Sequence, residues 1–470
     1  MQAELYSHGA AGEVTGSKHF LKVKDTTLMV DCGAFQGRRD ESDRKNREWP
    51  FDAREISAVV LSHAHFDHCG LLPLVAKRGF AGNVYSTPAT RDLASLVMMD
   101  SANIQAKDLE YLRKRARKRG QSFDKQPLYG ENEVVAALER FMTVSYHRRF
   151  ACADGMTATF YDAGHILGSA ATVIEARHNN QVLKVGFTGD LGRPGLPILR
   201  DPEQIPAVHY LVIESTYGNR LHKPIDQAAS DLAAAVTKTV ERGGKVIIPA
   251  FAIERVQELV YYLHLSVRER KIPKVPIYVD SPMASNATAI YQVHQECYDD
   301  ETRALFLSDH KNPFGFDDLT YVSSVAQSKR LNDLKKPAII IASSGMCEAG
   351  RILHHLLNNI EDPKNTILVV GYMAAGTLGR RILERESPLN ILGELRTPAA
   401  EVKVLNTFSA HADYNDILAY VGRLDRAELR EVFLVHGEAD SQTNLKRLLE
   451  AQHTKTTIVK PGERYPLFAD

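Results

Sequence analysis

The chain has 470 residues, 58 basic and 58 acidic side chains, and 44% hydrophobic residues. Its length supports two sizeable cores, and its zero net charge excludes nucleic-acid binding through overall charge, though not through a local basic surface. No apolar run is long enough for a membrane helix. Five scattered cysteines without a Cys-x-x-Cys pair, and an opening stretch without a signal sequence, predict reduced thiols in a cytoplasmic protein.

The first strong signal along the chain is a cluster of three histidines and one aspartate. Apolar residues 56–61 predict a buried strand and residues 70–75 a turn entering a helix, so the cluster lies at the C-terminal end of a core strand. Side chains two apart on an extended backbone point the same way, so His63 and His65 can hold one ion. Asp67 and His68, where the chain bends, can face a second. Imidazole and carboxylate ligands suit zinc, and a polar loop with incidental histidines is the weaker alternative.

The densest positive run follows at residues 113–119, Arg-Lys-Arg-Ala-Arg-Lys-Arg. A solvated helix face is the ordinary interpretation of such a run. An RNA-contacting arm is the alternative, because the run lies in the same region as the metal motif.

Three later strand ends each deliver one ligand-type residue beside a glycine. These residues are His165 after strand 157–161, Asp190 after strand 182–187 and His436 after strand 431–435. Each is weak alone, since a polar residue at a strand end is more often a turn residue. Together with the cluster they complete a two-metal set.

In this set each ion has three ligands of its own and one carboxylate is shared. The first ion takes His63, His65 and His165, and the second takes Asp67, His68 and His436, with Asp190 as the bridge. Asp31, at the end of the predicted strand 27–31, would hold the cluster's histidines by hydrogen bonds.

The pattern of predicted strands and helices along the chain indicates three regions, 1–205, 206–395 and 396–470. The middle region alternates apolar strands with amphipathic helices, which predicts a parallel α/β domain. Strands return in the last region and again end in histidines.

The order of these residues resembles the metallo-β-lactamase fold, an αββα sandwich with two metals at the edge of its sheets. Asp190 and His436 are 246 residues apart, which indicates a whole inserted domain. This resembles the β-CASP nucleases, whose parallel α/β cap interrupts the metallo-β-lactamase domain. Three further motifs of that family match residues 214–218, 408–413 and 434–438, and cap signatures match at 249–252, 280–284, 343–346 and 376–380.

The sequence of residues 408–413, Phe-Ser-Ala-His-Ala-Asp, is similar to the corresponding motif in the subgroup of the pre-mRNA 3′-end cleavage and polyadenylation nuclease subunit. We expect its short prokaryotic form, without the N-terminal RNA-binding extension of archaeal relatives or the extra C-terminal domain of long bacterial ribonucleases. His436 stands where RNA-acting branches carry His and the DNA-repair branch carries Val.

The resemblance implies a zinc-dependent ribonuclease that hydrolyses phosphodiester bonds of single-stranded RNA by a hydroxide activated by two Zn²⁺ ions. Endonuclease activity is expected, with 5′-to-3′ exonuclease activity left open. No membrane partner is expected. The oligomeric state is open, a homodimer included.

Catalytic and substrate-binding roles are expected for further residues. His411 would donate to the phosphoryl or leaving oxygen, oriented by Glu214, while Asp67 or Asp190 would accept the proton of water. The turn Ser343-Ser344-Gly345 would cradle a phosphate through backbone N–H groups, with a plain strand–helix turn as the alternative. Arg380 would clamp an RNA phosphate or form a surface salt bridge.

Three cap residues depart from the family pattern: Glu254 and Ala349 replace glycines, and Met373 replaces a polar residue. They leave substrate preference open. A DNA nuclease of the same family is the main functional alternative. A glyoxalase-type hydrolase or a diiron oxidase is a further alternative, but the inserted domain argues against it. An inactive RNA-binding scaffold is another, but the presence of every expected metal ligand argues against it.

Overall fold

The structure, a computed structural model, describes residues 2–178, 181–308, 312–371, 373, 376–405 and 407–469. The chain forms two compact units. Unit 1 comprises residues 1–194, 201–221 and 411–470, and unit 2 comprises residues 195–200 and 222–410. In the described ranges, no helix combines the length and hydropathy needed to cross a membrane.

Unit 1 contains two seven-stranded sheets. The first has the strand order β22 (Tyr465–Phe468), β1 (Gln2–Ser7), β2 (His19–Val23), β3 (Thr26–Val30), β4 (Ala58–Val60), β5 (Asn83–Ser86) and β6 (Phe141–Thr143). The second has the order β21 (Thr456–Ile458), β20 (Glu431–Val435), β11 (Tyr210–Glu214), β10 (Gln181–Phe187), β9 (Ala170–His178), β8 (Met156–Asp162) and β7 (Phe150–Ala153).

The two sheets of unit 1 enclose a common core. Burial alternates along β8, so Met156, Ala158 and Phe160 point inward, as expected for a strand with one buried face. They pack in one cluster with Leu28 and Val30 of the first sheet. Burying such side chains stabilises the fold by about 1.5–3 kcal/mol each for the larger ones.

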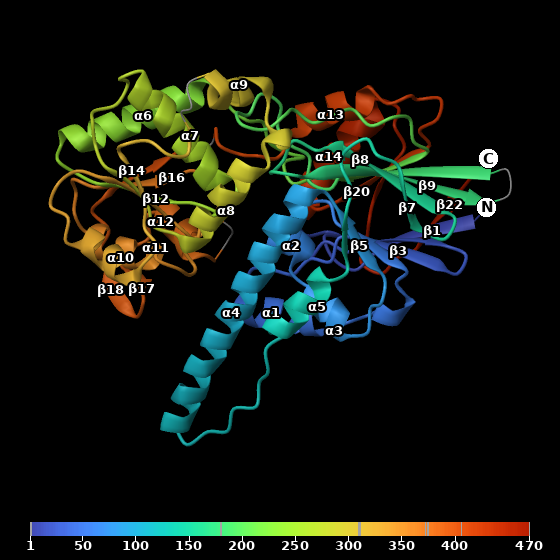
Figure 1. Ribbon diagram of the computed structural model, residues 1–470, viewed down its shortest axis with the longest axis horizontal. Coiled ribbons are helices and arrows are strands. Elements are labelled where there is room, and N and C mark those ends of the chain that lie inside the picture. The colour runs from blue at the N-terminus through green and yellow to red at the C-terminus, as the bar shows by residue number, and fades with distance from the viewer. Residues whose placement is uncertain are drawn as a thin grey trace. The chain divides into compact units, whose positions relative to one another are not determined.

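Helices cover the outer sides of this sandwich (Figure 1). On the side of the first sheet lie α1 (Arg39–Arg47), the 3₁₀ helix η1 (Ala53–Glu55), α2 (Phe66–Cys69), α3 (Leu72–Lys77), α4 (Pro88–Lys118) and α5 (Glu131–Leu138). On the second sheet lie α13 (Tyr414–Gly422) and α14 (Ala439–Ala451), which share a second core with it.

Unit 2 is built on a six-stranded sheet whose strand pairs are all parallel. Its order is β14 (Leu319–Tyr321), β13 (Ile277–Val279), β15 (Ile339–Ala342), β12 (Val246–Pro249), β16 (Thr366–Val369) and β19 (Glu401–Val404). The central strands are buried along their whole length, as parallel sheets covered on both faces require.

The remaining elements of unit 2 are seven α-helices among the described residues, one 3₁₀ helix and a hairpin. They are α6 (Asp226–Glu241), α7 (Arg255–Arg268), α8 (Pro282–Val293), η2 (Gln295–Cys297), α9 (Asp300–Ser308), α10 (Val325–Asn332), α11 (Ile352–Asn359), α12 (Leu378–Leu383), β17 (Leu389–Ile391) and β18 (Glu394–Arg396).

The structure has the expected architecture, a two-sheet sandwich interrupted by a parallel α/β unit. Apart from the short segment 195–200, which belongs to unit 2, the compact units divide the chain at 221/222 and 410/411, whereas the sequence pattern predicts boundaries at 205/206 and 395/396. The reason is strand pairing: β11 pairs with β10 and β20 in unit 1, whereas β19 pairs with β16 in unit 2.

Candidate metal centre and active site

The predicted ligands meet at one end of the unit 1 sheets, where β4, β8, β10 and β20 each end. His63 and His65 lie in the loop after β4, and Asp67 and His68 lie on the short helix α2. The other ligands come from three separate strand ends: His165 after β8, Asp190 after β10 and His436 after β20. All of these candidates belong to unit 1.

The first cluster consists of His63, His65, His165 and Asp190, whose ligand atoms lie within 4.8 Å of one another. His65 Nδ1 is 3.1 Å from His63 Nε2 and 3.2 Å from His165 Nε2. Asp190 Oδ2 lies 3.5 Å from His63 Nε2 and 3.6 Å from His165 Nε2. Four ligands tetrahedrally placed about 2.0–2.1 Å from a zinc ion are about 3.3 Å apart, so this spacing fits one ion.

The second cluster consists of Asp67, His68 and His436. His436 Nε2 lies 3.1 Å from His68 Nε2 and 3.6 Å from Asp67 Oδ2. The second oxygen of Asp190, Oδ1, faces this cluster at 3.4 Å from His68 Nε2. That oxygen is buried and has no hydrogen-bond partner among the described residues. Each oxygen of Asp190 therefore faces a different cluster, which is the placement that the predicted bridging role of Asp190 requires.

The protonation states suit metal binding at most of these residues. Burial is the main cause that lowers the pKa of His63 and His165 well below the usual value, and that of His65 to about 4, which leaves neutral imidazoles. Burial opposes ionisation of Asp190, but the surrounding histidines hold its pKa well below normal. His68 is the exception: despite burial, Asp190 and Asp31 raise its pKa.

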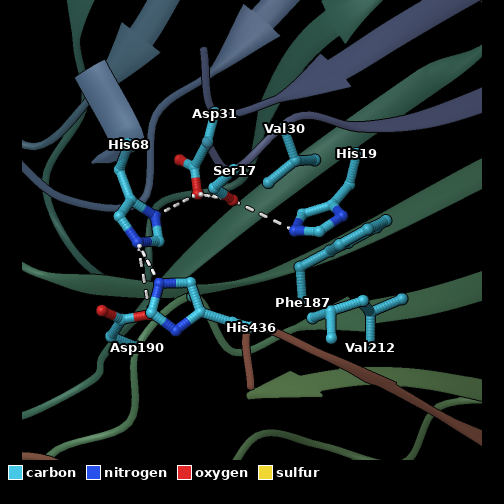
Figure 2. A pocket seen from close by; sticks show the side chains of 11 residues that line it. Ser17, His19, Val30, Asp31, His68, Phe187, Asp190, Val212 and His436 are labelled. Carbon is cyan, nitrogen blue, oxygen red and sulfur yellow. Dashed lines mark hydrogen bonds and ion pairs between the residues drawn. The ribbon is translucent and has the colours of Figure 1, made fainter. Parts of the chain in front are cut away.

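Asp31 fixes the orientation of His68 through Nδ1 of the imidazole (Figure 2). Its Oδ2 lies 2.7 Å from His68 Nδ1, which turns Nε2 toward the second cluster. The backbone N–H of Ser62 donates to Oδ1 at 2.8 Å, and the hydroxyls of Ser62 and Ser17 donate to Oδ2. The hydroxyl of Ser17 also contacts His19 Nε2 at 3.1 Å, which extends the network into β2.

A cavity of about 10 Å³ lies behind the second cluster, large enough for about one water molecule. Its polar lining includes Ser17, His19 and Asp31 on one side and His68, Asp190 and His436 on the other (Figure 2). Sequence reasoning found Asp31 but missed Ser17, His19 and Ser62, because nothing in their local pattern marks them as partners of a residue far along the chain.

His436 is held in place by Thr216 and Ala10. The Oγ1 of Thr216 lies 3.0 Å from Nδ1 of His436, and the backbone N–H of His436 donates to the carbonyl of Ala10 at 2.6 Å. Sequence reasoning missed Thr216, although the motif 214–218 that contains it was recognised.

Beside the first cluster, the buried Glu214 pairs with the partly buried His411. His411 Nδ1 lies 3.0 and 3.1 Å from the two carboxylate oxygens, and the backbone N–H of Leu191 donates to Oε1 at 2.7 Å. Burial alone would lower the pKa of His411, but the charge and hydrogen bond of Glu214, aided by Asp190 and Asp67, raise it to about 9. The imidazole lies 4.0 Å from Asp190 and keeps 21% of its side-chain surface exposed.

The predicted substrate contacts lie in unit 2 and remain predictions. The N–H of Ser344 donates to the carbonyl of Ala349 at 3.1 Å, so it is engaged within its own loop. The hydroxyl of Ser343 is buried without a hydrogen-bond partner in the described chain, and Gly345 packs against Phe251, whose ring a Cβ there would meet at 2.8 Å. Arg380 Nε donates to Glu384 at 2.6 Å across one helical turn.

Comparison with known proteins agrees with this architecture. A metallo-beta-lactamase superfamily domain matches residues 20–188, a Beta-Casp domain matches 256–382, and a Zn-dependent metallo-hydrolase RNA specificity domain matches 399–461. Ribonuclease TTHA0252 of Thermus thermophilus is 35% identical over 459 residues, covering 98% of this chain and 99% of that protein. The chain belongs to the β-CASP ribonuclease family. The resemblance found in the sequence and the expected fold class are confirmed.

Archaeal proteins are also similar to this chain. Transcription termination factor FttA of Methanosarcina mazei is 34% identical over 451 residues, covering 93% of this chain and 67% of the archaeal protein. A crystal structure of a protein of unknown function from Enterococcus faecalis covers 99% of this chain with a TM-score of 0.55 at 15% identity, which shows a shared fold only. The metallo-β-lactamase domain implies a divalent metal, and the donor set and spacing of the two clusters fit one.

Proposed function

We propose that this protein is a dinuclear zinc ribonuclease that hydrolyses phosphodiester bonds in single-stranded RNA. The observation that carries the proposal is the Glu214–His411 pair beside Asp190, because it adds a proton donor to the edge of a two-metal donor set. The RNA specificity domain match over 399–461 and the ribonuclease relative from Thermus thermophilus support RNA as the substrate. Cytoplasm is the proposed compartment, since the five cysteines are free and buried thiols.

The two zinc ions would be held by the two clusters with Asp190 between them, and would supply Lewis acidity that lowers the pKa of water and stabilises charge on the phosphoryl oxygens. Asp67 or Asp190 accepts the proton of the attacking water. The water oxygen bonds to phosphorus while the bond from phosphorus to the 3′ oxygen breaks. His411 gives its proton to that leaving oxygen, and Glu214 keeps the imidazole in place. The products are a 5′-phosphate and a 3′-hydroxyl.

The test uses zinc-loaded protein with RNAs labelled at the 5′ or the 3′ end, and maps the ends of the products. Internal cuts that leave 5′-phosphates are expected, and products shortened stepwise from the 5′ end would reveal additional exonuclease activity. A DNA of the same sequence is the matched substrate. Faster cleavage of DNA than RNA, or no cleavage of either, contradicts the proposal.

The role of His411 has a separate test. Replacing His411 by Ala should leave the zinc content unchanged and reduce cleavage by about 10²-fold or more, because it removes the proton donor without touching the proposed ligands. His354→Ala, an exposed histidine in unit 2, is the control and should cleave normally. Normal cleavage by the His411 variant rules out this assignment.

A further inference from the structure

Helix α4 extends well beyond the part of unit 1 that it packs against. It runs for 31 residues, Pro88–Lys118, and is therefore about 46 Å long. Its buried side chains are concentrated before residue 103, and only Leu109 is buried after that point. Figure 1 shows the C-terminal half of α4 and the following loop projecting away from the rest of unit 1 before the chain returns to α5. We call residues 105–126 the basic arm.

The basic arm carries a net positive charge, although the net charge of the whole chain is zero. It holds eight basic and three acidic residues, a net charge of +5, whereas the whole chain is neutral. Basic side chains in the last helical turn are partly explained by the helix dipole. The dipole acts only within that turn, so it does not explain Lys107 or Arg113.

Most of this charge is not neutralised by neighbours. Lys114 pairs with Glu110 at 2.6 Å and Lys125 with Asp43 at 2.8 Å. Six exposed basic residues of the arm form no ion pair with any described residue: Lys107, Arg113, Arg115, Arg117, Lys118 and Arg119. A cluster of solvated cations of this kind is suited to a polyanion.

An exposed aromatic side chain lies on the same helix face. Tyr111 is 65% exposed, and Lys114 and Arg115 follow it at the spacing of residues that share a face. Two turns earlier on this face Ile104 is 50% exposed. Cations that contact phosphates and an aromatic ring on which a base stacks are the two elements of single-strand recognition.

The N-terminal end of α4 is attached to the loop that carries a proposed metal ligand. The hydroxyls of Thr87 and Thr90 donate to the carbonyl of Gly168 at 2.7 and 2.8 Å, three residues after His165. The helix thus begins beside the metal centre and ends about 46 Å away.

We propose that the basic arm binds single-stranded RNA, holding a part of the substrate strand remote from the bond that is cut. This inference rests on the proposed function for the identity of the strand. It implies a preference for long RNA: the arm should lower KM for RNA that reaches it and leave the cleavage rate of short RNA unchanged.

The test replaces Arg115, Arg117, Lys118 and Arg119 together by Gln. The charge-preserving control replaces the three arginines by Lys. Binding of end-labelled RNAs of about 30 and about 8 nucleotides is measured by fluorescence anisotropy in EDTA, which stops metal-dependent cleavage; at about 3.4 Å per nucleotide only the longer RNA spans the helix. The Gln variant should bind the long RNA about tenfold or more weakly, and its salt-dependence slope should fall by about 3, because four cations each contribute about 0.7.

The Gln variant should lose less affinity for the short RNA than for the long RNA, because the short RNA cannot reach from the arm to the metal centre, and the Lys control should bind the long RNA normally. Tyr111→Ala should weaken long-RNA binding about tenfold, and Tyr111→Phe should not, because the ring supplies the stacking. Unchanged affinity of the Gln variant for long RNA overturns the inference, and so does an equal loss for short RNA. Failure of the proposed function is seen separately, as absence of cleavage by the zinc-loaded unmodified protein, and leaves the binding comparison readable.

Discussion

At the scale of single residues, two members of the site adopt backbone conformations that L-residues rarely take. Asp31 has φ +64° and His436 has φ +50°, both in the left-handed region. Such a conformation costs about 1–3 kcal/mol and persists only where surrounding contacts hold it. Here those contacts are Ser62 for Asp31 and Thr216 for His436. The strain is therefore coupled to the orientation of the imidazoles at the second cluster.

Replacing Asp31 by Asn should weaken zinc binding about 10- to 100-fold, because a neutral amide orients and polarises His68 less well than a carboxylate. Asn tolerates the left-handed conformation, so the backbone should not change. Competition of the protein with a zinc-binding dye measures the affinity, and the melting temperature of the metal-free protein checks the fold. Asp25→Asn, at the exposed turn between β2 and β3, is the matched control. Equal zinc affinity in both variants would show that Asp31 does not support the centre.

Glu254 in unit 2 occupies a strained turn. It has φ +70° and ψ −59°, and the N–H of Arg255 donates to the carbonyl of Ile253 at 2.9 Å, which together define a γ-turn of the strained kind. Glu254→Gly should stabilise the protein by about 1 kcal/mol, measured by urea unfolding, since glycine adopts positive φ without steric cost. Glu254→Gln removes the charge but keeps the Cβ, and should give no gain. A gain in the Gln variant would trace the effect to charge rather than to strain.

At the scale of elements, the loop that carries His165 depends on a close contact with the start of α4. Gly168 has φ +79°, and a Cβ there would lie 2.6 Å from the N of Thr90 and 2.7 Å from the Cβ of Ala89. The contact leaves no room for a side chain, so the loop and the helix fix each other.

Gly168→Ala should therefore destabilise the protein by about 2 kcal/mol more than a comparable substitution in open space, because overpacking adds to the cost of positive φ. Gly243→Ala is the matched control, with the same φ of +79° and no atom within 4 Å of the added Cβ. Chemical denaturation gives both stabilities, and zinc content shows whether His165 is displaced. Similar losses in the two variants would mean that the loop moves to accept the methyl group.

Most elements could be predicted from the sequence because their patterns are local. The buried strands β12, β15 and β16 are short apolar runs, the pattern from which strands are predicted in the middle region of the sequence. The predicted strand at 56–61 shortens to β4, Ala58–Val60, because the residues after it leave the sheet to present His63.

The residues that support the site were harder to predict from the sequence than the strands. His19 and Ser17 belong to the Asp31 network only because β2 and β3 pair antiparallel, with His19 opposite Val30. Such contacts depend on register rather than on any local pattern. The unit boundaries shifted for a related reason, since partner strands of β11 and β19 are distant in sequence.

At the scale of the whole molecule, the candidate ligands all lie in unit 1 although unit 2 separates them in sequence. The strand β20 returns after the insertion to pair with β11, which places His436 beside His68 across 368 residues. A metal bound there joins the first and last parts of the chain. Its binding energy should therefore stabilise unit 1 as a whole, because binding to the folded state alone adds to the stability of that state.

Zinc should slow amide hydrogen exchange throughout unit 1 and leave unit 2 unchanged. At about 1,000 times the dissociation constant, zinc adds about 4 kcal/mol to the stability of unit 1, enough to slow exchange by about 10³-fold where it requires opening of that unit. Peptides from β4 and β20 report on unit 1, and peptides from β12 and β15 report on unit 2, by mass spectrometry with zinc or with EDTA. His63→Ala should reduce the zinc effect in unit 1. Equal slowing in both units would show that they unfold together, and no slowing in either would show that the clusters do not bind zinc.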